Sequence, residues 1–254
     1  MKTVWATYTD KQEIIQFPVG FLKSEIPQLL VFASDEKEKK YLLSQGVPSA
    51  VIDFKITDKY SIATAQNLCV DKVFKELNAD FVVWLQADTY PTQEARKLIE
   101  DFTGNAQNLG KCIDFKVRHI RLFHTLNDST HFGCTVIGRH CPSRFVFDGC
   151  SVENVKTIDT EDLCVDIGYL SIEQTRRHLD SHADVWKFGE KYNPPADDKL
   201  FALHLLERNK LGENLGGIIE EGSHYFDLIC RMGLEKEYEK VKEITESLTN
   251  KIAV

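Results

Sequence analysis

Long apolar runs are missing from this chain of 254 residues. No stretch approaches the roughly 20 apolar residues that a membrane-spanning helix needs, so no span is predicted. The amino terminus, MKTVWATYTDKQ, has no apolar run of signal-peptide length, and we therefore expect a cytoplasmic protein. The seven cysteines include no C-x-x-C pair and fit neither a disulfide framework nor a zinc module. We expect reduced, mostly buried thiols.

Several signatures of common enzyme classes are also missing. No Gly-x-Gly-x-x-Gly follows a predicted strand, which argues against a dinucleotide oxidoreductase, and no Gly-x-Ser-x-Gly elbow supports an α/β hydrolase. The segment GNAQNLGKC, residues 104–112, departs from a phosphate-binding loop because five residues separate its glycines and Cys112 replaces the Ser or Thr that binds Mg²⁺. His178 and His182 are four apart, but Leu179 stands where a zinc protease has Glu.

A surplus of positive charge is absent as well, because 39 acidic residues outnumber 31 basic ones and the formal net charge is −8. Nucleic-acid binding depends on clustered Lys and Arg, so this balance argues against a protein that lives on nucleic acid. Apolar residues make up 43%, as in ordinary globular proteins. We expect one domain in three parts, which are a nucleotide-binding half, a mixed half and a helical extension: residues 1–103, 104–195 and 196–254.

Predicted strands and helices alternate through the first part of the chain. β-branched and apolar runs predict strands, and segments with apolar residues at helical spacing predict helices between them. This alternation indicates a parallel sheet with helices on its faces. The predicted strands are residues 2–9, 28–34, 49–56 and 80–85, and the predicted helices are 35–45, 62–77 and 92–102.

The pattern changes after Gly110. Two long alternating segments, residues 111–125 and 131–139, predict an antiparallel hairpin with a polar tip at 126–129. Helical patterns follow at residues 171–187, 197–210 and 234–251. The predicted fold class is therefore α/β, with a mixed Rossmann-type sheet, flanking helices and an antiparallel hairpin region in the second half.

The most informative stretch is ADFVVWLQADTYPT, residues 79–92, in which a buried strand runs into an acidic turn. In open α/β sheets, ligands bind at the carboxyl ends of the strands. A helix carrying Asn67 precedes this strand, and the turn reads Gln86-Ala87-Asp88. This order resembles the nucleotide-sugar-binding half of GT-A glycosyltransferases, in which the strand ends in Asp-x-Asp. The resemblance spans about residues 1–190, and Gln86 replaces the first Asp of the motif.

The resemblance implies a nucleotide-diphospho-sugar donor and a divalent metal, Mn²⁺ or Mg²⁺, held by Asp88 on the donor's diphosphate. Gln86 brings no charge, so a metal would rely on a further acid. The alternative for Gln86 and Asp88 is that they only cap the turn before the next helix.

The acidic segment 145–177 offers that further acid. Thr160-Glu161-Asp162 is similar to the Thr-Glu-Asp motif of inverting GT-A enzymes, which implies Asp162, with Glu161 beside it, as the catalytic base toward the acceptor hydroxyl. An exposed acidic turn explains the same residues equally well. The segment VDIGYLS, residues 165–171, looks like the family's His-Tyr-Gly segment, and Asp166 stands where that His approaches the metal.

Other donor contacts are expected where strands end. Thr7, Tyr8 and Thr9 close the first strand, where GT-A enzymes contact the nucleotide base. Asp53 follows on the third strand, and Arg176 has the planar fork that suits a diphosphate. For these residues a role in the core, at the surface or in a salt bridge is the alternative.

We expect a metal-assisted glycosyltransferase that acts on an acceptor hydroxyl. The acceptor stays open among a small molecule, a glycan, a protein and, less favoured by the charge, a modified nucleic-acid base. One alternative is a nucleotidyltransferase of similar fold, although residues 9–17 contain none of the glycines of its phosphate loop. The other is a non-catalytic glycan-binding or partner-binding domain that kept the fold.

Overall fold

The computed structural model describes residues 1–9, 12–57, 59–126, 132–146, 151–153, 155–158, 163–176, 195–211 and 215–252. The chain divides into two compact units, each of which is described by itself. The first unit contains Met1–Arg118 and Thr130–Asp166, and the second contains His119–Ser129 and Ile167–Val254. The predicted fold class is confirmed, because a mostly parallel sheet with flanking helices is followed by antiparallel strands. The three-part division predicted from the sequence stays a prediction.

Parallel strands form the centre of the first unit, in the order β4, β1, β2, β3. β8 runs antiparallel to β4, β6 runs antiparallel to β8, and β11 lies parallel to β6 on its other side. The sheet is therefore mixed. The strands are β1 (Thr3–Thr9), β2 (Leu30–Ala33), β3 (Ser49–Val51), β4 (Phe81–Leu85), β6 (Cys112–Arg121), β8 (Phe132–Gly138) and β11 (Lys156–Ile158).

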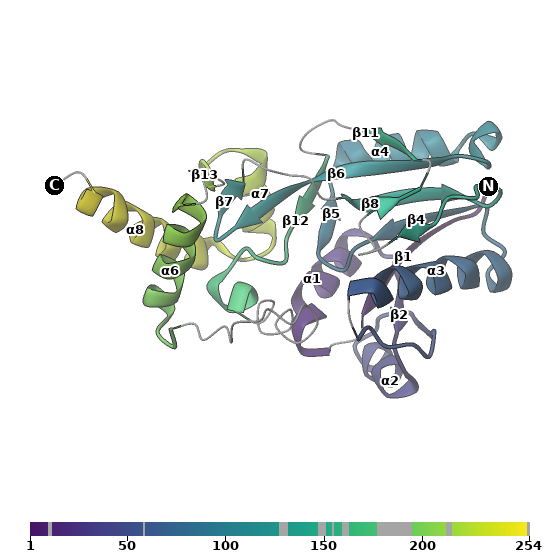
Figure 1. The fold of residues 1–254 in the computed structure, drawn as a ribbon, viewed down its shortest axis with the longest axis horizontal. Coiled ribbons are helices and arrows are strands. Elements are labelled where there is room, and N and C mark those ends of the chain that lie inside the picture. The colour runs from purple at the N-terminus through teal and green to yellow at the C-terminus, as the bar shows by residue number, and fades with distance from the viewer. Residues whose placement is uncertain are drawn as a thin grey trace. The chain divides into compact units, whose positions relative to one another are not determined.

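Helices cover both faces of this sheet, and Figure 1 shows α3 and α4 on either side of β4 and β8. Two of the helices begin at side chains that cap them. Asp35 accepts a hydrogen bond from the Glu38 amide at the start of α2, and Thr92 accepts one from the Ala95 amide at the start of α4. The helices are α1 (Gln12–Glu25), α2 (Glu36–Ser44), α3 (Lys59–Glu76), α4 (Gln93–Thr103) and the short 3₁₀ helix η1 (Ala106–Asn108).

The core of the first unit is organised around β4, whose five residues are all buried. Alternate side chains of a strand point to opposite faces of the sheet. Val82 and Trp84 join the cluster that α3 covers, while Phe81 packs edge-on against Phe102 of α4 with the ring centroids 6.0 Å apart. This two-sided burial explains the continuous apolar run FVVWL in the sequence.

Helix α1 was not among the predicted elements. Its sequence, QEIIQFPVGFLKSE, contains Pro18 and Gly20, and both residues normally argue against a helix interior. Val19, Leu22 and Ile26 are nevertheless buried, because tertiary packing outweighs the weak local preference. The third strand is also shorter than predicted, since β3 ends at Val51 and Asp53 has a positive φ of 52°.

The predicted hairpin is wrong in its first strand. β6 ends at Arg121 and turns back into β7 (His124–Leu126) through Leu122 and Phe123, whose φ angles are 45° and 59°. Two positive φ angles are what a tight hairpin turn requires, but Asn and Gly normally supply them. The turn was therefore invisible in the sequence. The Leu122 amide donates to the Tyr169 carbonyl, and the Phe123 carbonyl accepts from the Ile219 amide, so neighbouring segments hold this geometry.

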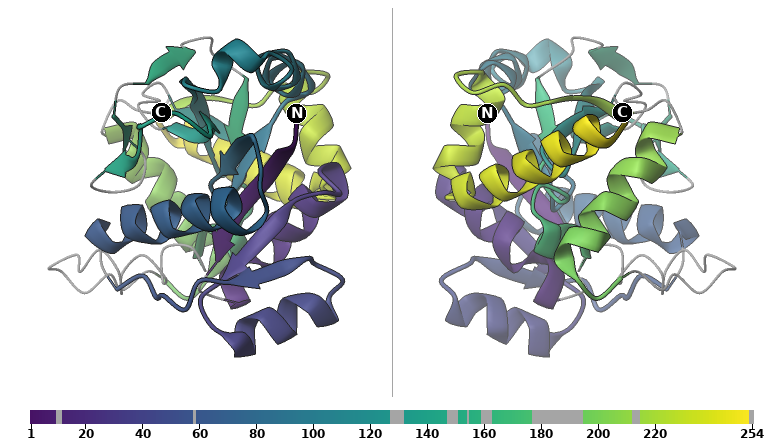
Figure 2. Two further views of the ribbon diagram at one scale, coloured as in Figure 1. Left: turned by 90° about the vertical axis from the view of Figure 1, so that its right-hand side faces the viewer. Right: turned by 90° about the vertical axis from the view of Figure 1, so that its left-hand side faces the viewer.

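The second unit packs three helices beside a short antiparallel pair, and Figure 2 shows α6 and α8 in its right-hand view. Tyr238 of α8 is the centre of its core. Its ring meets Phe123 and Phe226 edge-on at 5.6 and 5.0 Å, and its hydroxyl donates to the Ile219 carbonyl at 2.7 Å. The elements are α6 (Asp198–Leu211), β13 (Leu215–Ile218), which pairs with β7, α7 (His224–Arg231) and α8 (Glu235–Ile252).

α6 and α8 confirm two of the predicted helices, whereas β13 and α7 were not predicted. The helix predicted at residues 171–187 is helical at 172–176, and its remainder lies outside the described residues. None of the helices in the described part of the chain is long and apolar enough to cross a membrane.

The thiols behave as predicted throughout the described part of the chain. Six cysteines are free, and five of them are buried. Burial raises the pKa of Cys69 and of Cys112 well above the ordinary value, so these thiols stay protonated and unreactive.

A buried carboxyl group lies on β6. Asp114 is 1% exposed and accepts a hydrogen bond from the Thr135 hydroxyl at 2.7 Å. Burial raises its pKa to about 7, although the Thr135 bond acts in the opposite direction. At pH values between about 3.8 and 7 the folded chain therefore holds a proton that the unfolded chain has lost, so stability falls as the pH rises through this window.

Asp114→Asn should remove this pH dependence, because the amide keeps the shape and the acceptor oxygen but does not ionise. We expect its advantage over the unchanged protein to grow from pH 5 to pH 8 and to approach at most about 4 kcal/mol, from a pKa raised to about 7. Urea unfolding at a series of pH values measures it. Equal pH slopes for the two proteins would contradict the assignment.

Candidate donor-binding site

The carboxyl ends of β1 and β4 meet at one edge of the first unit's sheet. The two strands are parallel, and Ala6 pairs with Trp84. Thr7 is therefore level with Leu85, the last residue of β4, and Thr9 extends beside the turn Gln86-Ala87-Asp88. The structure thus brings the predicted contacts of the first strand and the acidic turn to the same edge, where open α/β sheets place their ligands. We call this the donor edge: Thr9 and the turn 86–88.

The turn at the donor edge is held against β8. The Gln86 amide donates to the Gly133 carbonyl at 2.8 Å, and the Thr89 amide donates to the Gln86 carbonyl at 3.0 Å. A Cβ at Gly133 would overlap the Thr89 hydroxyl and lie 3.0 Å from a methyl group of Val117. Only glycine lets β5 (Thr89–Pro91), the strand that follows the turn, cross β8 this closely.

Asp166 reaches the same place from far along the chain. It ends β12 (Cys164–Asp166), which pairs antiparallel with β5, and it lies directly opposite Thr89, one residue from Asp88. Asp166 is only 6% exposed. The sheet register therefore brings together the two residues that the sequence proposed as metal ligands, across 78 positions of chain.

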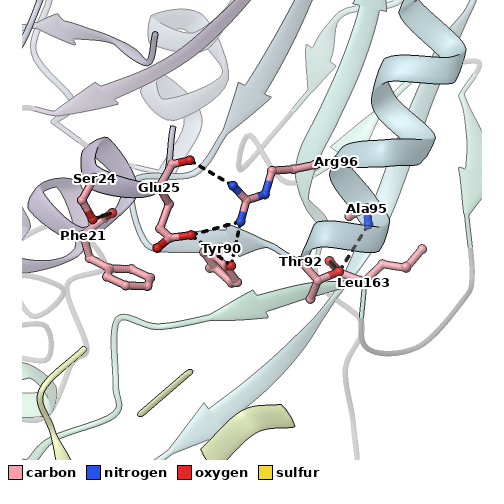
Figure 3. A network of polar contacts seen from close by, with 8 residues as sticks. All are labelled: Phe21, Ser24, Glu25, Tyr90, Thr92, Ala95, Arg96 and Leu163. Atoms are coloured by element: carbon pink, nitrogen blue, oxygen red, sulfur yellow. Dashed lines mark hydrogen bonds and ion pairs between the residues drawn. The ribbon is translucent and has the colours of Figure 1, made fainter. Parts of the chain in front are cut away.

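A charged network anchors β5 to the end of α1 (Figure 3). The Arg96 guanidinium donates to the Glu25 carbonyl at 2.9 Å, to the Glu25 carboxylate at 3.1 Å and to the Tyr90 hydroxyl at 2.8 Å. The Phe21 ring packs on Tyr90 with a centroid separation of 5.5 Å. The planar guanidinium serves several acceptors at once, which fixes the segment immediately after the turn.

Thr92 provides a second anchor in the same view (Figure 3). Its amide and its hydroxyl each donate to the Leu163 carbonyl at 2.9 Å, and its hydroxyl caps α4 through the Ala95 amide. Leu163 directly precedes β12. One side chain thus starts α4 and holds the entry to the strand that delivers Asp166.

The residues at the end of β1 differ in their surroundings. The hydroxyl oxygens of Thr7 and Thr9 are buried and have no hydrogen-bond partner among the described residues. A buried, unsatisfied hydroxyl costs about 1–3 kcal/mol, so two of them in a row at the donor edge are unusual in a finished core. The Tyr8 hydroxyl, on the opposite face of the strand, donates to the Phe54 carbonyl at 2.8 Å and ties β1 to the segment after β3.

Asp53 and Asn67 serve the backbone in different ways. Asp53 is exposed and occupies the left-handed region, which Asp tolerates better than most residues. The Asn67 amide donates to the Phe145 carbonyl at 2.9 Å and accepts from the Phe145 amide at 3.0 Å. It therefore clamps β9 (Phe145–Val146), which pairs with β10 (Ser151–Val152), to α3. Donor contact by either residue stays a prediction.

Three further predicted residues are not placed at the donor edge. Glu161 and Asp162 lie outside the described residues. Arg176 belongs to the second unit, where it donates to the Pro195 carbonyl at 2.8 Å, pairs with Asp198 at 3.3 Å and stacks over the Phe201 ring at 4.0 Å. These contacts support the salt-bridge alternative, and a role at the diphosphate stays a prediction.

Sequence reasoning missed Gly133 and the network around Arg96. A glycine inside a predicted strand is a recognised sign of close backbone approach, so Gly133 could have been noticed. Nothing in the sequence pairs Glu25 with Arg96, because the contact joins residues 71 positions apart.

The donor edge has the chemistry of a magnesium or manganese site of the substrate-assisted kind. Such ions bind through one or two carboxylates, with substrate phosphates and water as further ligands. Asp88 and Asp166 are the two carboxylates, and Gln86 has an amide oxygen. Within the described residues no group of three or more His, Cys, Asp or Glu side chains forms a metal cluster.

Comparison with solved structures finds transferases and a synthetase of limited similarity. The chain resembles mannose-1-phosphate geranyltransferase from Thermus thermophilus with a TM-score of 0.36, CMP:2-keto-3-deoxy-manno-octonic acid synthetase complexed with CTP with 0.37, and a glycosyltransferase involved in glycosylation of the major capsid of PBCV-1 with 0.32. Each is 12% identical and matches 55% of this chain. The matched shares of those proteins are 58%, 75% and 60%, respectively. No family description and no curated protein matches the sequence.

Gly133→Ala should disturb the donor edge, because the added methyl group collides with the Thr89 hydroxyl. We expect a loss of about 1–3 kcal/mol in the free energy of unfolding, the usual cost of overpacking. Thr89→Ala in the same chain should recover part of this loss. The matched control is Gly110→Ala, whose added Cβ would have nothing within 4 Å. Equal urea stabilities of Gly133→Ala and Gly110→Ala would show that the crossing is looser than described.

Proposed function

We propose that this protein is a nucleotide-sugar-dependent glycosyltransferase whose donor diphosphate binds at the donor edge. The observation that carries the proposal is the β5–β12 register, which sets Asp166 opposite Thr89 and next to Asp88. Two carboxylates from distant segments converge where the motif of GT-A enzymes has two acids close together in sequence. Asp166 thus supplies the charge that Gln86 lacks.

Each group at the edge has a separate task in this proposal. Asp88 and Asp166 hold the divalent ion, which when bound neutralises the diphosphate and makes it a better leaving group. The unsatisfied hydroxyls of Thr7 and Thr9 suit polar groups of the nucleotide. Gln86 orients the donor through its neutral amide, and Asp162, or Glu161 beside it, removes the proton from the acceptor hydroxyl.

The alternative reaction of similar chemistry is nucleotidyl transfer. The two reactions differ in which bond of the donor breaks: glycosyl transfer releases a nucleoside diphosphate, whereas nucleotidyl transfer from a triphosphate releases pyrophosphate. The segment 9–17 contains no glycine for a triphosphate loop, which favours glycosyl transfer. Release of nucleoside diphosphate without pyrophosphate is the expected product pattern.

Asp88→Asn should weaken donor binding at least tenfold in the presence of Mn²⁺, because the amide removes one charge but keeps the shape. A thermal-shift series over nucleoside diphosphates and nucleotide sugars, with and without Mn²⁺, measures the effect, since ligands that bind only the folded state raise its melting temperature. Asp166→Asn should act in the same way. The matched control is Glu94→Gln, which removes an exposed charge in the first turn of α4. Unchanged donor and Mn²⁺ shifts in both Asp variants would disprove the proposal.

A further inference from the structure

The first unit contains a cavity that the donor-edge proposal does not use. Its volume is about 660 Å³, within the range of small-molecule sites. α4 contributes Leu98 and Phe102 to its walls, β6 contributes Ile113 and Phe115, and β11 contributes Ile158. These side chains are all apolar. Figure 1 shows the three elements, with α4 and β11 beside β6.

The cavity lies at the opposite end of the strands from the donor edge. Cys112, which lines it, pairs with Ile137 at the start of β6, and the next residue of β8, Gly138, pairs with Phe81 at the start of β4. The cavity is therefore level with the amino end of β4, whereas the acidic turn follows its carboxyl end. Five strand residues rise about 15 Å, so the two places are separate.

Two lysines bring positive charge to this otherwise apolar cavity. The Lys111 ammonium donates to the Asn108 side-chain oxygen at 2.9 Å, and the Asn108 amide is itself held by the Phe102 carbonyl at 2.9 Å. Lys156 is exposed on β11. Neither lysine forms an ion pair with a carboxylate in the described part of the chain. The remaining charged residue of the lining is Asp101, which is exposed on α4.

This combination is selective about its occupant. Apolar walls favour an apolar body, and an unneutralised pair of ammonium groups favours an anionic head. The protein as a whole carries a formal charge of −8, so the excess of cations here is local. We propose that the cavity is a second ligand site, which takes a small organic anion with an apolar body, such as an aryl or alkyl carboxylate or sulfonate.

Two fluorescent dyes of the same shape test the proposal with the full chain. Anilinonaphthalene sulfonate has an apolar body with an anionic head, and phenylnaphthylamine has the same body without the charge. The unchanged protein should bind one molecule of the sulfonate per chain and prefer it to the neutral dye. Lys111→Glu with Lys156→Glu should weaken the sulfonate at least tenfold and leave the neutral dye within about twofold. Lys156→Gln should give a smaller loss in the same direction.

Matched variants separate this site from general dye binding. Lys37→Glu with Lys40→Glu makes the same charge change on the exposed side of α2 and should leave both dyes unaffected. Gly110→Phe places a ring in the cavity wall, where an added Cβ has open space, and should weaken both dyes. Urea midpoints show that each variant is folded. The proposal is overturned if both dyes weaken equally in the lysine variants, if the α2 control has the same effect, if Gly110→Phe has none, or if the folded protein binds neither dye.

Discussion

The complete burial of β4 is the constraint on which the rest of the first unit depends. Its five side chains are divided between the cluster under α3 and the face that α4 covers, so the strand cannot shift by one residue without exchanging the two faces. Its pairing with β1 and β8 then sets where the chain emerges. The acidic turn has its position because β4 ends at Leu85 and the Gln86 amide is already bonded to Gly133.

The two ends of this sheet have different chemistry for reasons that follow from that arrangement. At the carboxyl ends of β1 and β4, short turns expose carboxylates and leave threonine hydroxyls unsatisfied. At the amino end of β4, the start of β6 and the addition of β11 leave an apolar cavity with lysines beside it. The first arrangement suits a metal-bound diphosphate, and the second suits an amphipathic anion. Both depend on the same strand pairing, so a change that slips β4 would affect both.

Much of the fold was predictable because its periodic elements are strongly patterned. The apolar run of β4, the capped helices α2 and α4, and α3 follow from local rules. The exceptions have identifiable causes. α1 contains Pro18 and Gly20, which local rules count against a helix, and the turn at Leu122 and Phe123 uses positive φ angles without glycine. In both places tertiary contacts outweigh local preference.

The candidate site was predictable only in part. The turn 86–88 and Asp166 were recognisable as separate chemical features, but the register that sets them side by side depends on pairing between β5 and β12. The network of Glu25, Tyr90 and Arg96 has no sequence signal at all, because its members are joined only in the folded chain. Local pattern shows which residues have suitable chemistry, whereas long-range pairing decides which of them meet.

The most direct test of the donor edge is crystallographic. Crystals grown with Mn²⁺ and a nucleoside diphosphate should show one strong anomalous peak at the manganese edge, bounded by the carboxylates of Asp88 and Asp166, with the diphosphate next to it. A diphosphate bound elsewhere on the chain, or a manganese ion that contacts neither carboxylate, would contradict the account.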